Sequence, residues 1–273
     1  MSTTPAETGP NEVRHALGRR NFIKLALAGS AAVVGAKALP KNNRSDADGT
    51  SPYRWGMVID LDNCIGCGYC TLACKANNDI SPDIAWNRLF ELDKIQGERQ
   101  YMPVPCQQCE HAPCVDACPV KATYHRADGI VMMDYDRCIG CRYCEVACPY
   151  GARSFNWKEF EAENPLVPTW GTPEVERRPR GVVEKCAFCY QRIDRGLEQG
   201  LTPGVDLEAT PACVGACPTG ARVFGDLNDP ESPVSQLLAN NHVTRLREDL
   251  GTEPRVFYIH ARFNDENTKE ICG

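Results

Sequence analysis

Four cysteines between residues 134 and 152 have the spacing of an iron-sulfur binding segment. The stretch DYDRCIGCRYCEVACPYGA contains Cys138, Cys141, Cys144 and Cys148 in a C-x2-C-x2-C-x3-C pattern, and Pro149 follows directly. This is the pattern of bacterial ferredoxins. A short loop can fold three thiolates over three corners of a cubane, while the fourth thiolate, at the start of a helix, points away. Because that fourth cysteine binds the other cluster in two-cluster ferredoxins, one run predicts a partner run.

Three further groups of cysteines supply candidates for that partner. Of the 17 cysteines, 16 fall into groups of four, and Cys272 stands alone near the C-terminus. The first group, CIGCGYCTLAC, and the third, CIGCRYCEVAC, form an internal duplication. The second group has x4 in place of the second x2, and the fourth group is split by an insertion. The other three groups are Cys64, Cys67, Cys70 and Cys74; Cys106, Cys109, Cys114 and Cys118; and Cys186, Cys189, Cys213 and Cys217.

Disulfides, zinc sites and iron-sulfur clusters are the three kinds of chemistry that such cysteines offer. Repeated C-x2-C units place the cysteines too close together for a disulfide framework to be favoured. A structural zinc protein is the stronger alternative, because paired C-x2-C units also occur in four-cysteine zinc ribbons. Three groups, however, end in a cysteine followed by Pro119, Pro149 or Pro218, which a zinc ribbon does not need. We therefore favour clusters.

Residues 1–38 have the features of a twin-arginine export signal. Arg19 and Arg20 precede an apolar run over residues 25–36, which is rich in Ala and Gly. This run is shorter than the roughly 18 to 20 apolar residues that span a bilayer. The triplet at 36–38 predicts cleavage after Ala38, and an uncleaved signal that anchors the protein is the alternative. The export route carries folded proteins, which suits a chain that must acquire its iron in the cytoplasm.

After a polar linker at residues 39–52, the pattern predicts several regular elements. Strands are expected at 55–61 and 255–263, and two short strands about a turn at 128–129. Helices are expected at 190–200 and after a Ser232 N-cap. An insertion at 155–183, rich in proline and containing Trp157 and Trp170, is expected to be an ordered surface loop against a partner, with a mobile linker as the alternative.

Composition and motifs exclude several classes of function. The formal net charge of -6 gives no basic signature for nucleic acid. The chain contains no nucleotide loop, catalytic triad or paired carboxylates, so no catalytic residue is proposed. Beyond Ala38 no stretch is apolar enough to cross a membrane. If a quinone gives or takes the electrons, another subunit must therefore provide the membrane site.

The order and spacing of the four groups resemble those of the four-cluster iron-sulfur subunit of the dimethyl sulfoxide and polysulfide reductase family. The resemblance covers roughly residues 53 to 265, including the segment GDLNDPESPV. It implies an electron-transfer subunit that is not itself the catalyst. Such a subunit connects a polytopic quinone-interacting membrane subunit with a molybdopterin or multihaem cytochrome subunit. The export signal and the insertion are similar to those of periplasmic relatives, which implies a place on the periplasmic side of the cytoplasmic membrane.

The resemblance also implies a nested ligation of four 4Fe-4S clusters, whereas spacing alone would equally permit adjacent groups to pair. We name the four implied sets sites 1 to 4. Site 1 comprises Cys64, Cys67, Cys70 and Cys217; site 2 comprises Cys74, Cys186, Cys189 and Cys213; site 3 comprises Cys106, Cys109, Cys114 and Cys148; and site 4 comprises Cys118, Cys138, Cys141 and Cys144.

The expected fold class is α+β, with two ferredoxin-like units, each holding two 4Fe-4S clusters, within a four-cluster domain at 53–273. The outer unit would comprise residues 53–100 and 184–225, and the inner unit residues 101–154. Residues 155–183 would be an insertion, and residues 226–273 a C-terminal extension. A free soluble periplasmic polyferredoxin that shuttles between complexes is the alternative function.

Several side chains beside the cysteines are assigned secondary roles. Ile65, Tyr69, Ile139 and Tyr143 are expected to shield the clusters from water. Lys185 and Arg142 are candidates for raising a cluster potential electrostatically. His111 is not expected to be a ligand, because the cysteines of its group already complete the count.

Overall fold

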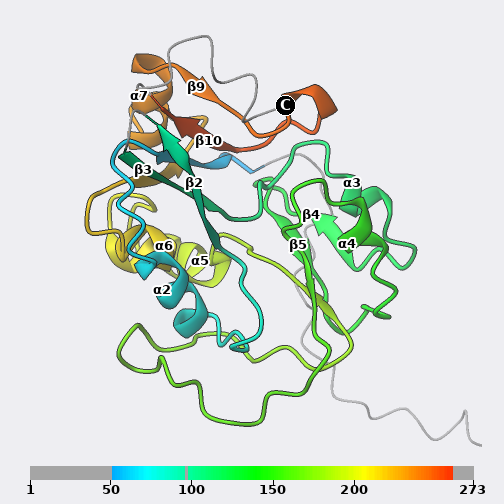
Figure 1. The fold of residues 1–273 in the computed structure, drawn as a ribbon. Coiled ribbons are helices and arrows are strands. Elements are labelled where there is room, and N and C mark those ends of the chain that lie inside the picture. The colour runs from blue at the N-terminus through cyan, green and yellow to red at the C-terminus, as the bar shows by residue number, and fades with distance from the viewer. Residues whose placement is uncertain (1–50, 96–97, 261–273) are drawn as a thin grey trace, which may run out of the picture. The chain divides into compact units, whose positions relative to one another are not determined.

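A four-stranded sheet brings together strands from near both ends of the described chain (Figure 1). The computed structural model describes residues 51–95 and 98–260. The predicted signal peptide, most of the linker and Cys272 lie outside these residues. The strand order is β8-β1-β10-β9, with β1 parallel to β10 and antiparallel to β8. The bounds are β1 (Trp55–Asp60), β8 (Arg222–Asp226), β9 (Val243–Thr244) and β10 (Val256–Ile259).

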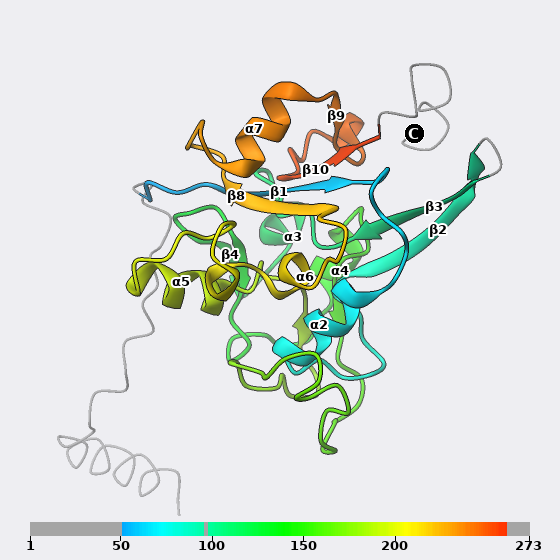
Figure 2. The same ribbon diagram turned by 90° about the vertical axis from the view of Figure 1, so that its left-hand side faces the viewer.

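Alternate residues of β1 face two different hydrophobic clusters. Val58 packs with Phe257 in the cluster beneath helix α7 (Pro233–Asn240), whereas Met57 and Ile59 belong to the large core that contains most of the cysteines. Figure 2 shows α7 on one side of the sheet and α2, α5 and α6 on the other. Ser232 caps α7 by accepting a hydrogen bond from Ser235 N, as predicted. The sheet therefore separates α7 from the cysteine core.

Three two-stranded sheets complete the strand content of residues 51–95 and 98–260. The predicted short strands about residues 128–129 are confirmed as β4 and β5, and the first predicted strand is confirmed as β1. The hairpin of β2 and β3 is a feature that the sequence pattern did not predict. The bounds are β2 (Arg88–Ile95), β3 (Glu98–Val104), β4 (Thr123–His125), β5 (Val131–Met133), β6 (Ser154–Phe155) and β7 (Val183–Glu184).

Four short helices each begin one residue before the third cysteine of a group. They are α2 (Tyr69–Asn77), α3 (Pro113–Asp116), α4 (Tyr143–Ala147) and α6 (Ala212–Gly215). The predicted helix in the split group is confirmed as α5 (Tyr190–Glu198), and two 3-10 turns lie at η1 (Leu207–Ala209) and η2 (Glu248–Leu250). None of the helices in the described parts of the chain has the length and hydrophobicity that crossing a bilayer requires.

The insertion at 155–183 is attached to the end of α2 and to the residues that follow it. The Arg177 guanidinium makes hydrogen bonds of 3.0 and 2.9 Å with the two carboxylate oxygens of Asp79. Asn164 Nδ2 donates to the Lys75 carbonyl over 3.1 Å, and the Trp170 ring contacts that of Tyr69 with centroids 4.7 Å apart. The insertion therefore lies against the first cysteine group.

The segment before β10 binds the backbone of the second cysteine group. Arg255 N donates to the Gln107 carbonyl over 2.9 Å, and Glu110 N donates to the Glu253 carbonyl over 3.0 Å. His111 N donates to the Thr252 carbonyl over 3.1 Å. Because β10 also pairs with β1, one segment supports the strand before group one and the loop of group two.

The CIGC turns of the duplicated groups require glycine at the same place. Gly66 and Gly140 have φ values of 71° and 68°, in the left-handed region that non-glycine residues rarely adopt. A Cβ atom on Gly140 would lie 2.3 Å from the carbonyl oxygen of Gly181. Neither the conformation nor the space allows another residue here without strain.

Gly140→Ala should lower the melting temperature of the cluster-loaded protein by about 4 °C or more, because left-handed strain and a backbone clash add up. Circular dichroism during heating would measure this. Gly215→Ala is the matched control, because its Cβ would meet Leu207 at an ordinary 3.5 Å within a helix. An unchanged melting temperature for Gly140→Ala would contradict the strain argument.

Candidate iron-sulfur cluster sites

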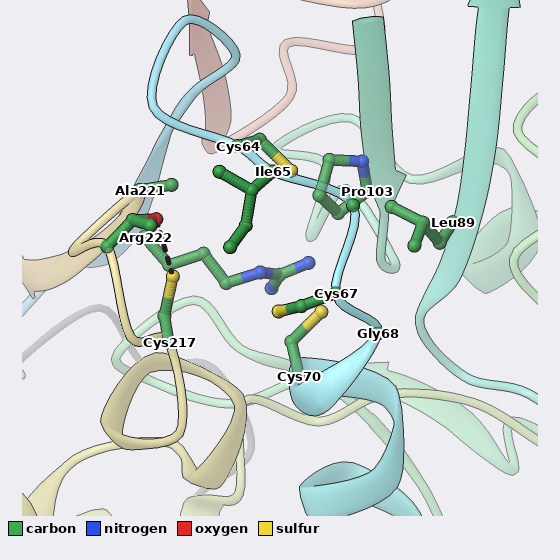
Figure 3. A pocket seen from close by; sticks show the side chains of 12 residues that line it. Cys64, Ile65, Cys67, Gly68, Cys70, Leu89, Pro103, Cys217, Ala221 and Arg222 are labelled. Carbon is green, nitrogen blue, oxygen red and sulfur yellow. Dashed lines mark hydrogen bonds between the residues drawn. The ribbon is translucent and has the colours of Figure 1, made fainter. Parts of the chain in front are cut away.

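The four cysteines predicted to form site 1 line one cavity (Figure 3). Cys64 and Cys67 come from the loop that joins β1 to α2, Cys70 comes from the first turn of α2, and Cys217 comes from the turn between α6 and β8. Burial raises the pKa of the Cys64 thiol, and the nearby Cys70 and Cys217 raise it further. Cysteines separated by more than a hundred residues therefore share one small space.

The predicted members of site 2 form a second neighbourhood, which is more deeply buried. Burial raises the pKa of Cys74, and Cys186, Cys189 and Cys213 are the groups that raise it next. Asn78 Nδ2 lies 3.5 Å from Cys189 Sγ and 3.9 Å from Cys74 Sγ, so one amide can donate to two sulfurs.

Site 3 is brought together around Cys109. Burial raises the pKa of this thiol to about 12, with Cys106, Cys114 and Cys148 contributing in the same direction. Backbone amides of Ala152 and Tyr150 oppose the corresponding increase at Cys148. All four predicted members of site 3 thus influence one another electrostatically.

In site 4, Cys138 influences Cys144, and Cys118 is held by backbone amides. Burial raises the pKa of Cys144, Arg153 lowers it, and Cys114 and Cys138 raise it. The Cys118 sulfur accepts a hydrogen bond of 3.1 Å from Ala122 N. Burial would raise the pKa of Cys118, but amides of Thr123, Ala122 and Val120 bring it below its ordinary value. Cys141 is exposed.

Electrostatic contacts between sites give them a spatial order. Cys213 of site 2 is influenced by Cys70 of site 1, and Cys186 of site 2 by Cys106 of site 3. Cys144 of site 4 is influenced by Cys114 of site 3. Cysteines assigned to sites 1 and 2, to sites 2 and 3, and to sites 3 and 4 are therefore close enough to affect one another's pKa.

Repeated aspartates position the two duplicated loops. Asp60 Oδ1 accepts hydrogen bonds from the amides of Asp62 and Asn63, at 2.9 and 3.3 Å. Asp134 Oδ1 accepts from the amides of Asp136 and Arg137, both at 3.1 Å. These hydrogen bonds between a carboxylate and the following backbone amides form a turn where each strand ends. The turn leads the chain into the cysteine loop.

Sites 1 and 4 reach the surface. Cys67 and Cys141 are the exposed cysteines among the sixteen described. Ile65 and Ile139, predicted to shield the clusters, are 60% and 65% exposed, and Tyr69 and Tyr143 are also exposed. These four side chains lie on the outside of the isolated chain, and we call the pair beside Cys67 in the sequence and the pair beside Cys141 the two apolar rims.

Two buried arginines touch cysteine sulfurs and were missed by the sequence analysis. Arg153 Nη2 lies 3.0 Å from Cys114 Sγ, and Arg222 Nη1 lies 3.4 Å from Cys213 Sγ. A signal was present, because Arg153 and Arg222 end the repeated segments CPYGAR and CPTGAR.

Lys185 and Arg142, the two cations predicted to raise a cluster potential, have different surroundings. Lys185 is buried, and its Nζ donates to the carbonyls of Val131 and Cys186. Arg142 lies over the rings of Trp157 and Phe155 at the surface. His111 lies 3.8 Å from the Glu253 carboxylate, and both side chains are exposed.

The donor set fits a soft metal centre. Thiolates select iron-sulfur clusters and other soft ions, and binding must remove the thiol protons. Burial raises the pKa of Cys213 to about 11, so a positive partner would favour ionisation of this thiol. Within residues 51–95 and 98–260, no three or more His, Cys, Asp or Glu side chains converge tightly enough to hold one metal ion. A cubane cluster is larger than a single ion. Each of its iron atoms binds a different thiolate, so the four sulfurs need not converge on one point.

Known families and proteins match most of the described residues. A 4Fe-4S dicluster domain matches residues 98–164, a second matches residues 137–221, and a 4Fe-4S binding domain matches residues 55–76. The menaquinone reductase iron-sulfur cluster-binding subunit of Nitratidesulfovibrio vulgaris is 43% identical, over 77% of this chain and 89% of that protein. One subunit of the selenate reductase of Mesobacillus selenatarsenatis is 42% identical, over 76% and 72%. One subunit of the polysulfide reductase of Wolinella succinogenes is 35% identical, over 76% and 94%.

Nested pairing predicts which cysteine variants affect the same cluster. The loaded wild-type chain should contain about sixteen iron and sixteen sulfide, whereas a zinc protein would contain neither. Cys67→Ala combined with Cys217→Ala should leave three intact 4Fe-4S centres, because both residues belong to site 1. Iron and sulfide assays with electron paramagnetic resonance would count them.

The matched control combines Cys67→Ala with Cys141→Ala, which belong to sites 1 and 4. This pair should leave only two intact centres. If the Cys67 and Cys217 pair also left only two, nested pairing would be wrong and pairing of adjacent groups would gain support.

Proposed function

Because this protein belongs to the family of iron-sulfur subunits of dimethyl sulfoxide, polysulfide, tetrathionate and selenate reductases, we propose that it relays single electrons through four 4Fe-4S clusters at sites 1 to 4. The nested ligand sets and the two ferredoxin-like units are part of this proposal. The observation that carries it is the series of adjoining sites, which begins and ends at exposed cysteines.

The residues of this protein would bind the clusters, exclude water from them and adjust their reduction potentials. When bound, the clusters supply one-electron chemistry. Seven of the eight cysteines of sites 2 and 3 are buried, and Cys148 is the exception. Amide donors such as Asn78 Nδ2 and Ala122 N would stabilise charge on the sulfurs. The exposed rims of sites 1 and 4 would let electrons enter and leave.

We further propose that the two ends contact different proteins. One would be a polytopic quinone-interacting membrane subunit, and the other a molybdopterin or multihaem cytochrome subunit on the periplasmic side of the membrane. The apolar rims formed by Ile65 with Tyr69 and by Ile139 with Tyr143 support contacts at both ends, because exposed apolar groups favour burial against a partner. The twin-arginine pair at residues 19–20 supports export of the loaded, folded protein.

The tagged protein should co-purify from gently solubilised membranes with a large redox subunit and a membrane subunit. Ile139→Lys with Tyr143→Lys should reduce that recovery at least about tenfold without changing iron content, because two charges at an apolar interface are costly. Val205→Lys with Leu207→Lys is the control, since these side chains are similarly exposed but lie in neither rim. If the wild-type protein elutes without any partner subunit, the result would favour a free soluble polyferredoxin.

Replacing both Arg19 and Arg20 with lysine should keep the protein in the cytoplasm, with its iron bound and residues 1–38 still attached. Cell fractionation and N-terminal sequencing would measure location and cleavage, and the wild-type mature protein should begin at Leu39. Arg14→Lys, outside the pair, is the control and should be exported normally. Unimpaired export of the double variant would exclude the twin-arginine route.

A further inference from the structure

Two arginines occupy equivalent places in the two halves of the cysteine core. Arg153 is the fifth residue after Cys148, and Arg222 is the fifth residue after Cys217, in the repeated pattern C-P-x-G-A-R. Each residue is only 3% exposed. The corresponding positions after Cys118 and Cys74 hold Thr123 and Asp79, so the repeat supplies one cation to each pair of sites.

The guanidinium groups contact sulfur and neutral oxygen atoms. Arg153 donates to Cys114 Sγ over 3.0 Å and to Thr123 Oγ1 over 3.2 Å. Arg222 donates to Cys213 Sγ over 3.4 Å and to Asn87 Oδ1 over 2.5 Å. Each also lies near a methionine sulfur, that of Met133 or of Met57.

A buried guanidinium needs an anion, because taking an unpaired charge out of water is very costly. Within the described residues, no carboxylate oxygen lies within 4.0 Å of either group. Other buried arginines do have such a partner, as Arg178 has Glu184 at 2.9 Å. The compensating charge for Arg153 and Arg222 must therefore come from the cysteine sulfurs.

Each arginine lies beside cysteines of two sites. Arg222 donates to Cys213 Sγ of site 2, and it lines the same cavity as the four cysteines of site 1. Arg153 donates to Cys114 Sγ of site 3 and to the hydroxyl of Thr123, which directly follows Ala122, the residue whose amide donates to Cys118 Sγ of site 4. Figure 3 shows the Arg222 side chain reaching across the space between Cys64, Cys217 and Cys70.

We propose that Arg222 and Arg153 are fixed cations that raise the reduction potentials of the two clusters beside them, Arg222 at sites 1 and 2 and Arg153 at sites 3 and 4. This proposal rests on the proposed clusters. A cluster held by four thiolates is negative, and reduction adds one more electron to it. A nearby cation stabilises the reduced form more than the oxidised form, so the potential rises. Because arginine cannot lose its proton in a protein, the effect does not depend on pH.

Arg153→Gln and Arg222→Gln test the proposal, since glutamine keeps a donor group but removes the charge. Potentiometric titration of the intact complex, followed by electron paramagnetic resonance, should show two of four transitions moved to lower potential in each variant. The two transitions that move in Arg153→Gln should be the two that stay unmoved in Arg222→Gln. The equilibrium constant for reduction should fall about tenfold or more, which is 59 mV for a one-electron couple.

Two controls distinguish the effect of removing the charge from the effect of disturbing the surrounding structure. Arg153→Lys and Arg222→Lys keep the charge and should stay within about threefold of the wild-type constants. Arg178→Gln with Glu184→Gln removes an equally buried but neutral pair and should leave all four transitions unmoved, even if it lowers the melting temperature.

Iron and sulfide analysis distinguishes the possible failures. Absence of clusters from the wild-type protein would remove the proposed function itself. Full iron content with wild-type potentials in both glutamine variants would overturn the role of the arginines while leaving the proposed function intact. If the glutamine variants do not assemble, the lysine variants decide, because a tenfold loss despite a retained charge would also overturn the proposal.

Discussion

Burial of closely spaced thiols is the constraint on which this structure depends. Sixteen cysteines lie within one unit of the chain, and most of them belong to its largest hydrophobic cluster. Burial and mutual repulsion raise the pKa of Cys109 to about 12 and that of Cys213 to about 11. The core therefore cannot hold its cysteines as free anions. Positive charge has to enter with them, from iron or from the protein, so metal binding and stability of the core are coupled.

Features encoded within a few residues could be predicted from the sequence. The cysteine spacing, the turn at 128–129 and the Ser232 cap each depend on neighbouring residues, and the structure has the corresponding elements. The resemblance added the grouping of distant cysteines, which spacing left open. In the structure Cys217 lines the same cavity as Cys64, an arrangement that neither cysteine's neighbours in sequence specify.

Features that depend on tertiary contacts could not be predicted in the same way. The parallel pairing of β10 with β1 joins residues from opposite ends of the described chain, and no turn fixes its register. The β2–β3 hairpin lies in a stretch without a strong alternating pattern. Arg153 and Arg222 end a repeated segment, but that repeat does not reveal that Cys114 and Cys213, from other parts of the chain, lie beside them. Lys185 and Arg142, by contrast, adjoin cysteines in sequence, yet Arg142 lies against aromatic rings.

The segment before β10 links the two halves of the cysteine core. Its residues 252–255 bind the backbone of the loop that carries Cys106 and Cys109, and the strand that follows pairs with β1, directly before Cys64. Tyr258 continues this contact, because its hydroxyl accepts a hydrogen bond from Gln107 over 3.2 Å. Electron transfer through several centres requires that their separations stay constant. Backbone hydrogen bonds resist sliding more effectively than apolar contacts, which are non-directional. A segment without any clustered cysteine can therefore fix the spacing between the loop that carries Cys106 and Cys109 and the strand that leads to Cys64.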